Sequence, residues 1–381
     1  YYVGQTFNHG VENGSIKLSP ITTGLTDTDG SETLKVTISG LPVGSVLTDG
    51  HGNTLTTTDG TLDVTGWHLD SLVLTPPPLT HGSFDLTVTA TSTETVGGDS
   101  HDSNLTLPVT VVPTTYNVVL SASTSVLEGG TITYTASLVD GNGKPVTAHT
   151  HAVTVTLESG KTITIEAGAS SGELLVKAAN DIYVGAPSVS EKFDSASGSD
   201  FSALNGNKTP VITSVTDVND TTTLKLTATS SVAEGGIITY SATLLGKDGV
   251  TPVTAGSAMT ITLSNGKTLT IAKGASTSNS ATAAAPNDIY TDNKPVEVSV
   301  TKTVGGNFEQ LDSTTQGNAS TTVTDVNDLT TVKLTATPSV SEGGTITYSA
   351  TLVGKDGVTP VTAGSTMTIT LSNGKTLTIL K

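Results

Sequence analysis

The stretch from residue 259 to residue 271 reads MTITLSNGKTLTI, and it decides the fold class. Apolar residues alternate with threonine on both sides of Ser264-Asn265-Gly266, which is the period-two pattern of strands that bury one face. Asn-Gly between two such runs is a strong signal for a tight hairpin. The stretch therefore predicts two antiparallel strands, and an identical copy stands at 367–379.

The hairpin belongs to a longer repeat. Residues 224–271 and 332–379 align at a constant offset of 108 with six differences, all small or conservative. A more diverged copy begins near Tyr116. Because solenoid units run about 20–50 residues and cannot fold alone, a period near 107 predicts that each repeat is a domain. Duplication leaves near-identical neighbouring repeats when selection acts on the length of the array or on the number of repeats. This favours a mechanical role for the chain.

Alternating runs continue on both sides of the hairpin through the whole second repeat. Threonine, serine, valine and glycine dominate and no 3.6-residue stripe appears, so helix is expected to be negligible. Seven short strands in about 100 residues predict an immunoglobulin-like β-sandwich. The predicted strands lie at 223–230, 237–245, 258–263, 267–272, 277–283, 295–303 and 319–326.

The first ~113 residues lack the repeat but are also strand-like, as in the alternating run 84–90. Trp67 is expected to fill the core of this module, with stacking on a ligand as the alternative. The chain is thus predicted to be all-β, with tandem β-sandwich domains in an elongated array. The predicted domains are 1–113, 114–220, 221–328 and 329–381, the last being the N-terminal half of a further repeat. Such a half-sandwich exposes unpaired strand edges, so we expect the parent protein to continue.

Composition limits the class of protein. Of 381 residues, 35% are hydrophobic and 4% aromatic, which suits several small cores better than one large core. The formal net charge of −17 makes nucleic acid and anionic membranes poor partners and attracts cations. With no cysteine, a disulfide, a cysteine-based zinc site and a thiol nucleophile are excluded. No apolar run approaches the ~20 residues of a membrane span, and residues 1–4 are not a signal peptide, so any export signal lies outside this sequence.

Three acidic motifs recur in the repeats, and strand parity places them at one end of each domain. Glu-Gly-Gly falls in the loop between the first and second strands, Asn-Asp-Ile-Tyr between the fifth and sixth, and Asp-Val-Asn-Asp after the seventh. Because antiparallel strands reverse at every turn, these loops share the end that faces the next domain. The next domain offers its second loop to the same junction. The predicted ligands of the two junctions are Glu128, Asp181, Asp217, Asn219, Asp220 and Asp248, then Glu234, Asp288, Asp292, Asp325, Asn327, Asp328 and Asp356.

Carboxylates and amides crowded in this way suit Ca²⁺, which accepts six to eight oxygen ligands in flexible geometry. Zinc prefers histidine or cysteine, and magnesium retains water. A bound calcium ion would neutralise the cluster and stiffen the joint between domains. The alternative is that these residues only form turns, as Asp and Asn commonly do. Asp27, Asp29 and Glu32 form a separate and weaker candidate metal site.

One junction departs from the pattern. Residues 111–115 read VVPTT, with no acidic linker, between the first module and the first repeat. We expect this joint to lack the calcium site and to depend on proline stiffness or direct packing. In the first repeat, His149 and His151 are predicted to share a strand face, as exposed histidines or, alternatively, as a two-histidine metal site.

Signatures of catalysis are missing from the sequence. It contains no HExxH, no Walker loop, no nucleophile elbow and no GxGxxG between a strand and a helix. Serine and threonine are abundant, but none stands in a recognisable order with a histidine and an aspartate. The prediction is that the chain is not an enzyme.

With these motifs in place, residues ~114–381 resemble the bacterial immunoglobulin-like repeats of giant RTX-type biofilm adhesins, and residues ~10–113 look like the cadherin-like modules of the same proteins. The resemblance implies export by type I secretion, a bacterial cell-surface location outside the cell, and calcium between extender domains. Neither an RTX nonapeptide block nor a retention module is visible, so the sequence assigns the chain neither to the anchor nor to the tip.

Three functions follow as hypotheses. The first is a calcium-rigidified spacer that supports cell adhesion and biofilm formation, with neighbouring repeats of the same chain as its partners and any glycan or cell-surface ligand bound by domains outside this sequence. The second makes one module, the N-terminal one, a binding domain for a glycan or a surface. The third makes the array a spacer in a secreted polysaccharide-degrading enzyme.

Overall fold

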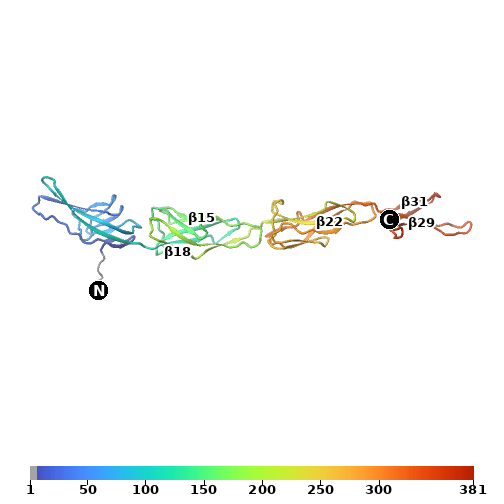
Figure 1. Cartoon of the computed structure of the whole chain (residues 1–381), viewed down its shortest axis with the longest axis horizontal. Coiled ribbons are helices and arrows are strands. Elements are labelled where there is room, and N and C mark those ends of the chain that lie inside the picture. Colours follow the sequence, from blue (N-terminus) through green and yellow to red (C-terminus); the bar gives the residue numbers. More distant parts are fainter. Residues whose placement is uncertain (1–6) are drawn as a thin grey trace, which may run out of the picture. The chain divides into compact units, whose positions relative to one another are not determined.

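The computed structural model describes residues 7–381, so the segment 1–4, excluded above as a signal peptide, lies outside the described residues. Its regular elements are the strands β1 to β32, and residues 7–381 contain no helix (Figure 1). This confirms the prediction of tandem all-β sandwich domains. The described part of the chain has no helix of the length and apolarity needed to cross a membrane.

The chain divides into two compact units. Unit 1 holds the residues up to Ala179 together with Pro187–Thr216, and unit 2 holds Asn180–Ala186 together with Asp217–Lys381. The short segment Asn180–Ala186 thus leaves the fold of the first repeat and packs with the second. The predicted boundaries after residues 113, 220 and 328 stay predictions.

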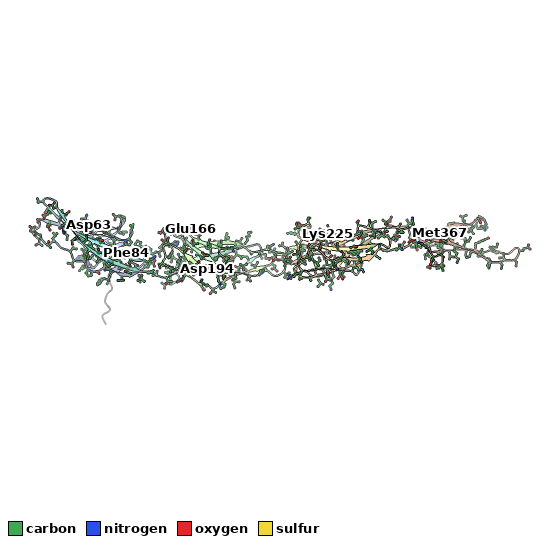
Figure 2. All side chains as sticks on the ribbon, in the orientation of Figure 1. Asp63, Phe84, Glu166, Asp194, Lys225 and Met367 are labelled. Carbon is green, nitrogen blue, oxygen red and sulfur yellow. The ribbon has the colours of Figure 1, made fainter. Side chains whose placement is uncertain are left out.

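The first module, residues 7–113 of unit 1, is built from two sheets with strand orders β1-β9-β8-β3-β6 and β2-β7-β4-β5. Alternation along the strands points Val36, Ile38 and Leu86 into the core. Trp67 packs partly buried against this core, as predicted, and so does Phe84, which Figure 2 labels. The strands are β1 (His9–Val11), β2 (Ile16–Lys17), β3 (Glu32–Ser39), β4 (Val46–Thr48), β5 (Thr54–Thr56), β6 (Thr61–Asp63), β7 (Val73–Thr75), β8 (Gly82–Glu94) and β9 (Ser100–Val112).

The first repeat has its own core in unit 1. One sheet has the order β15-β12-β10-β18, and two smaller sheets have the orders β11-β19-β16 and β14-β13-β17. Ile132, Tyr134, Ala136 and Leu138 alternate along β12 and are all buried. The strands are β10 (Tyr116–Ala122), β11 (Ser125–Leu127), β12 (Thr131–Val139), β13 (Val153–Leu157), β14 (Thr162–Ile165), β15 (Ser171–Lys177), β16 (Val189–Glu191), β17 (Phe193–Ser197), β18 (Leu204–Gly206) and β19 (Val211–Thr216).

The second repeat, in unit 2, shows the same design. Its sheets have the orders β25-β22-β20-β27 and β21-β28-β26-β23-β24, and the predicted hairpin is the antiparallel pair β23–β24. The strands are β20 (Thr221–Ala228), β21 (Ser231–Ala233), β22 (Ile237–Leu245), β23 (Met259–Leu263), β24 (Thr268–Ile271), β25 (Ala281–Ala284), β26 (Pro295–Gly305), β27 (Gln310–Asp312) and β28 (Asn318–Thr324).

The structure adds two strands to the seven predicted for this repeat. β21 follows the first predicted strand, lies in the other sheet and runs parallel to β28, and β27 runs parallel to β20. The fifth predicted strand begins at Ala281 rather than at residue 277. Asn279 is held elsewhere, since its main-chain N–H donates to the Thr270 carbonyl at 3.0 Å and its side-chain oxygen accepts from the Thr270 N–H at 2.7 Å.

The remaining residues of unit 2 form two hairpins. β29 pairs with β30 and β31 pairs with β32, each antiparallel and each a two-stranded sheet. Every residue of β29 is exposed, whereas β20, its counterpart in the second repeat, alternates between buried and exposed. The strands are β29 (Thr331–Ala336), β30 (Tyr348–Val353), β31 (Met367–Thr370) and β32 (Thr376–Ile379).

Candidate metal centre

The three acidic motifs of the second repeat meet at one end of that repeat. Glu234 follows β21, Asp288 lies between β25 and β26, and Val326 follows β28. The Asp288 N–H donates to Glu234 Oε1 at 3.4 Å, and the Val326 N–H donates to Glu234 Oε2 at 3.3 Å. One carboxylate therefore ties together two loops that lie 54 and 92 residues away in the sequence, as the strand parity predicts.

Asp325 supplies an unsatisfied oxygen at this end. Its N–H donates to Asn293 Oδ1 at 3.3 Å, but its own Oδ1 is buried and has no hydrogen-bond partner. A buried carboxylate oxygen without a donor costs free energy, and a cation is one of the few groups that can remove that cost. This oxygen fits a calcium ligand.

The other predicted ligands of this end are placed differently. Asp292 forms an ion pair with Lys294. The hydrogen bond to Asp292 and its charge, together with the charge of Asp288, raise the pKa of the Lys294 ammonium. Asn327 and Asp328 are exposed. A metal ion that used Asp292 would therefore have to displace an ammonium group.

A second acidic group lies where the segment Asn180–Ala186 packs within unit 2. The Asn180 side chain donates to Asp220 Oδ2 at 2.8 Å, and the Asp220 N–H donates to Glu309 Oε2 at 2.7 Å. Carboxylate oxygens of Asp181 and Glu309 lie within 4.8 Å of each other. Glu309 Oε1 is buried and has no hydrogen-bond partner, so it resembles Asp325 Oδ1. Two carboxylates this close repel each other unless a cation lies between them.

Asp217 has a different role in the same group. Its two oxygens accept hydrogen bonds from the Gly185 N–H at 2.8 Å and the Ala186 N–H at 2.6 Å, which anchors the segment. Asn219 is exposed. Glu128 belongs to unit 1, where its N–H donates to the Thr216 carbonyl at 3.0 Å. Its role as a ligand stays a prediction.

Glu309 is the ligand candidate that the sequence did not indicate. It lies between β26 and β27, and the first repeat has Ser202 at the corresponding place, so no repeated motif marks it. The position of its loop was the available signal. Because the chain reverses at every turn, the loop between the sixth and seventh predicted strands lies at the same end of the domain as the loop that carries Asp248.

Asp248 and Asp356 serve their own turns. Asp248 Oδ1 accepts from the N–H groups of Val250 and Thr251, both at 2.9 Å, while Oδ2 accepts from the Thr251 hydroxyl. Asp356 repeats this pattern with Val358 and Thr359. The Thr359 hydroxyl and these amides lower the pKa of Asp356 to about 2. Both carboxylates therefore form turns, which is the alternative raised for this residue type.

The weaker candidate, in the first module, is a strongly acidic surface. Asp27 Oδ1 accepts from the Asp29 N–H at 3.0 Å, and Glu32 lies directly opposite Glu94 in the β3–β8 pair. Loss of contact with water raises the pKa of Glu32, and the charges of Glu94, Asp27 and Asp29 raise it further. Glu94 is a fourth acidic residue that the motif did not reveal.

The joint between the first module and the first repeat, inside unit 1, is closed by direct contacts, one of the two mechanisms expected for it. Leu79 is 8% exposed and belongs to the core of the first repeat. The Asn13 side chain donates to the Tyr116 hydroxyl at 2.8 Å and accepts from the Leu79 N–H at 3.0 Å. The buried Glu12 accepts from the N–H of Thr114 at 2.8 Å and from its hydroxyl at 3.1 Å.

The prediction of a shared strand face was wrong for both histidines, because neither lies in a strand. The prediction of exposure was wrong for His149, which is 2% exposed. Its ring nitrogens lie 2.8 Å from the His151 carbonyl and 2.6 Å from the Ala169 carbonyl, so the loop folds around the ring. His151 is exposed and contacts Asp200 at 2.7 Å. Burial opposes ionisation of Asp200, but the hydrogen bonds from His151 and Thr150 outweigh it and lower the pKa.

Comparison with known protein families supports the division of residues 114–381 into repeats. The model of the LapA domain matches residues 114–218, 220–326 and 328–381, which is well over half of the chain. The chain belongs to the LapA domain family. Membership confirms the resemblance to biofilm adhesins in its general form and indicates a surface-associated protein. The first module lies outside the matched LapA domains.

No curated protein matches the chain. Among solved structures, the BSP domain of a biofilm-associated protein is 14% identical, with 82% of this chain and 62% of that chain covered and a TM-score of 0.16. The FN1–FN3 domains of chicken CNTN1 are 11% identical, with 83% and 98% covered and a TM-score of 0.21. β-Glucuronidase 3 of Bacteroides uniformis is 14% identical, with 55% and 24% covered and a TM-score of 0.17. The chain thus spans less than two thirds of the biofilm protein and of the glucuronidase, and at these TM-scores the likeness carries no functional argument.

Proposed function

We propose that this chain is a structural extender of a bacterial surface adhesin, in which calcium bound at the ends of the LapA domains stiffens the joints between them. The observation that carries the proposal is that Glu309 Oε1 and Asp325 Oδ1, both in unit 2, are buried carboxylate oxygens without a donor. Each lies in a loop at the end of a domain, where a bound cation would connect neighbouring segments.

The donor set supports calcium over other metals. The two acidic groups of unit 2 offer carboxylates, amide oxygens and main-chain carbonyls, and none of the histidines or cysteines that zinc prefers is among them. Calcium takes six to eight such oxygens without demanding one geometry, while magnesium keeps several waters. Asp181, Glu309 and Asp220 would hold one ion, and Asp325 with Glu234 and Asp288 would hold another.

The proposal also accounts for where the protein works. Extracellular modules bind calcium with dissociation constants of about 10⁻⁴–10⁻³ M, which is met outside the cell and not in the cytosol. The joints would therefore stiffen after export, which we assign to type I secretion on the resemblance to RTX adhesins. In this role the chain catalyses nothing, its partners are its neighbouring domains, and a glycan or cell surface is bound elsewhere in the adhesin.

Small-angle scattering of the whole chain in calcium and in EDTA tests the proposal. Calcium should increase the maximum dimension and reduce the flexibility seen in a Kratky plot. A triple variant, Asp181→Asn, Glu309→Gln and Asp325→Asn, should scatter in calcium as the unaltered chain does in EDTA.

The matched control removes three charges from exposed positions of unit 1, with Asp85→Asn, Glu166→Gln and Glu173→Gln. It should respond to calcium like the unaltered chain. Identical scattering of the unaltered chain in calcium and in EDTA would show that stiffening does not occur.

A further inference from the structure

In unit 2, two tyrosines make the same contact with the domain that follows them. The Tyr183 hydroxyl donates to the Thr254 carbonyl at 2.8 Å, and the Tyr290 hydroxyl donates to the Thr362 carbonyl at 3.0 Å. Both tyrosines end an Asn-Asp-Ile-Tyr motif, and both threonines begin a Thr-Ala-Gly-Ser loop. The contact is therefore a repeated feature of the array.

The glycine of each loop faces the ring. A Cβ atom at Gly256 would lie 2.7 Å from Cδ1 of Tyr183, and one at Gly364 would lie 2.8 Å from Cδ1 of Tyr290. Neither glycine has a positive φ, so the backbone alone would accept alanine. It is the aromatic ring that requires glycine here.

Main-chain bonds hold the tyrosine segment on the second repeat. The Val184 N–H donates to the Asn307 carbonyl and the Glu309 N–H donates to the Ile182 carbonyl, both at 3.1 Å. The rings of Tyr183 and Phe308 stack with centroids 6.0 Å apart. An extended segment thus pairs with the loop between β26 and β27 through one antiparallel bridge, and its tyrosine side chain lies against the Thr-Ala-Gly-Ser loop.

The first repeat receives a different side chain. Main-chain hydrogen bonds align the two loops, since the Gly168 N–H donates to the His149 carbonyl at 3.0 Å as the Gly274 N–H donates to the Ala255 carbonyl at 2.8 Å. Thr150 therefore stands where the second repeat has Gly256, and it puts a Cβ atom at the glycine position. The buried His149 beside it lies 5.8 Å from the ring of Phe201. From the first module comes Leu79, which lies in the same core cluster as Phe201 and lines one hollow with Ala148 and Thr150.

We propose that this loop, with the phenylalanine beside it, is a receiving surface whose central residue decides which kind of module can precede a repeat. Glycine at this position accepts the tyrosine of a preceding LapA domain. Threonine leaves room for the smaller, aliphatic side chain of the first module, but its Cβ excludes the tyrosine. A LapA domain with threonine here starts a run of repeats, and one with glycine continues it.

This surface lies next to a proposed calcium site, since the Tyr183 N–H donates to Asp181 Oδ1 at 2.7 Å, but the tyrosine side chain makes its contacts with other groups. The ring and hydroxyl of Tyr183 contact the Thr254 carbonyl, the Thr254 hydroxyl and Phe308, none of which is acidic. Seating of the tyrosine should therefore persist in EDTA. A failure of the calcium proposal would leave this one standing, and the reverse also holds.

Amide hydrogen exchange of the whole chain in EDTA tests the proposal. Gly256→Ala should speed exchange at Val184 and Glu309 about tenfold, because the ring can no longer fit against the loop, and Gly256→Thr, which introduces the residue of the first repeat, should do at least as much. Gly246→Ala in the same repeat is the control, since its Cβ would meet no atom closer than 3.6 Å. Unchanged protection along β22 shows that the repeat stays folded.

A double-mutant cycle identifies the ring as the cause. Tyr183→Ala alone should speed exchange as Gly256→Ala does, and adding Gly256→Ala to Tyr183→Ala should change nothing further. Unaltered exchange in Gly256→Ala, or two effects that simply add, would overturn the proposal.

Discussion

The joint inside unit 1 and the domain ends inside unit 2 are built from different chemistry. In unit 1 the aliphatic Leu79 enters the core of the first repeat. The buried Glu12 accepts from Thr114 with one oxygen, while its Oε1 makes no hydrogen bond and lies 3.7 Å from Nδ1 of His81. In unit 2, Glu309 Oε1 and Asp325 Oδ1 are buried with no donor and no basic side chain forms an ion pair with them among the described residues.

The difference shows how the closure of a joint between domains can be made to depend on calcium. Burying an aliphatic side chain removes apolar surface from water under any ionic condition, so a joint of that kind is always closed. Burying carboxylate oxygens without donors is unfavourable until a cation arrives, so a joint of that kind closes in response to calcium. The predictions below test whether this contrast holds.

The largest effect is expected at Leu79. Leu79→Ala should destabilise the first repeat by about 2–4 kcal/mol, because it removes a buried side chain and leaves a cavity. The positive φ of 64° is unfavourable for both residues, so backbone strain does not contribute to the difference. Urea unfolding, followed in calcium and in EDTA, measures the change.

The loss should be the same with and without calcium. Leu55→Ala, at a leucine that is 43% exposed, is the control and should cost far less. A loss at Leu79 that appears only in EDTA would break the contrast between the joints.

A smaller effect is expected at Asp325. Asp325→Asn should weaken calcium binding about tenfold, since it removes a charged ligand while keeping the size of the side chain. Isothermal titration calorimetry of the whole chain measures the affinity. Asp312→Asn removes the same charge from a carboxylate whose Oδ1 already accepts from Thr314 and Thr315, so it should leave the affinity unchanged.

Equal affinities in the two variants would mean that the orphaned oxygen of Asp325 does not mark a site.

The smallest effect concerns the turn carboxylate Asp356. Its pKa is lowered from 3.8 to about 2 in the folded chain, so its contribution to stability is present above pH 3.8 and is lost as the pH falls through about 2. An NMR titration should show the Val358 and Thr359 amide signals moving near pH 2, unaffected by calcium, and Asp356→Asn should abolish this titration. Calcium-dependent shifts of these amides would restore the sequence-based role of Asp356 as a ligand.

Sequence and structure agree where local pattern decides the outcome. The run at 259–271 specifies two strands and their turn because alternation and Asn-Gly act over a few residues. Strand parity also brings the motifs of Glu234, Asp288 and Asp325 to one end. The strands β21 and β27 escaped prediction, because each is only three residues long and pairs in parallel with a strand far away in the sequence.

Prediction failed for residues whose role depends on a contact with a residue far away in the sequence. Glu309 stands in no repeated motif, and its importance comes from lying beside Asp181. His149 looks like a surface histidine until the loop folds around it. Tyr183 ends a repeated motif that was interpreted only through its aspartate, and its contact with the loop of Gly256 joins positions more than seventy residues apart.

The sequence alone thus determined the all-β class, the domain period, the acidic motifs and the end of the domain at which they gather, since these follow from alternation, turn chemistry and chain reversal. The tertiary structure decided which carboxylate oxygens find donors and which remain without one, and which side chain each domain receives from its neighbour. Those outcomes depend on distances between loops that no local pattern encodes.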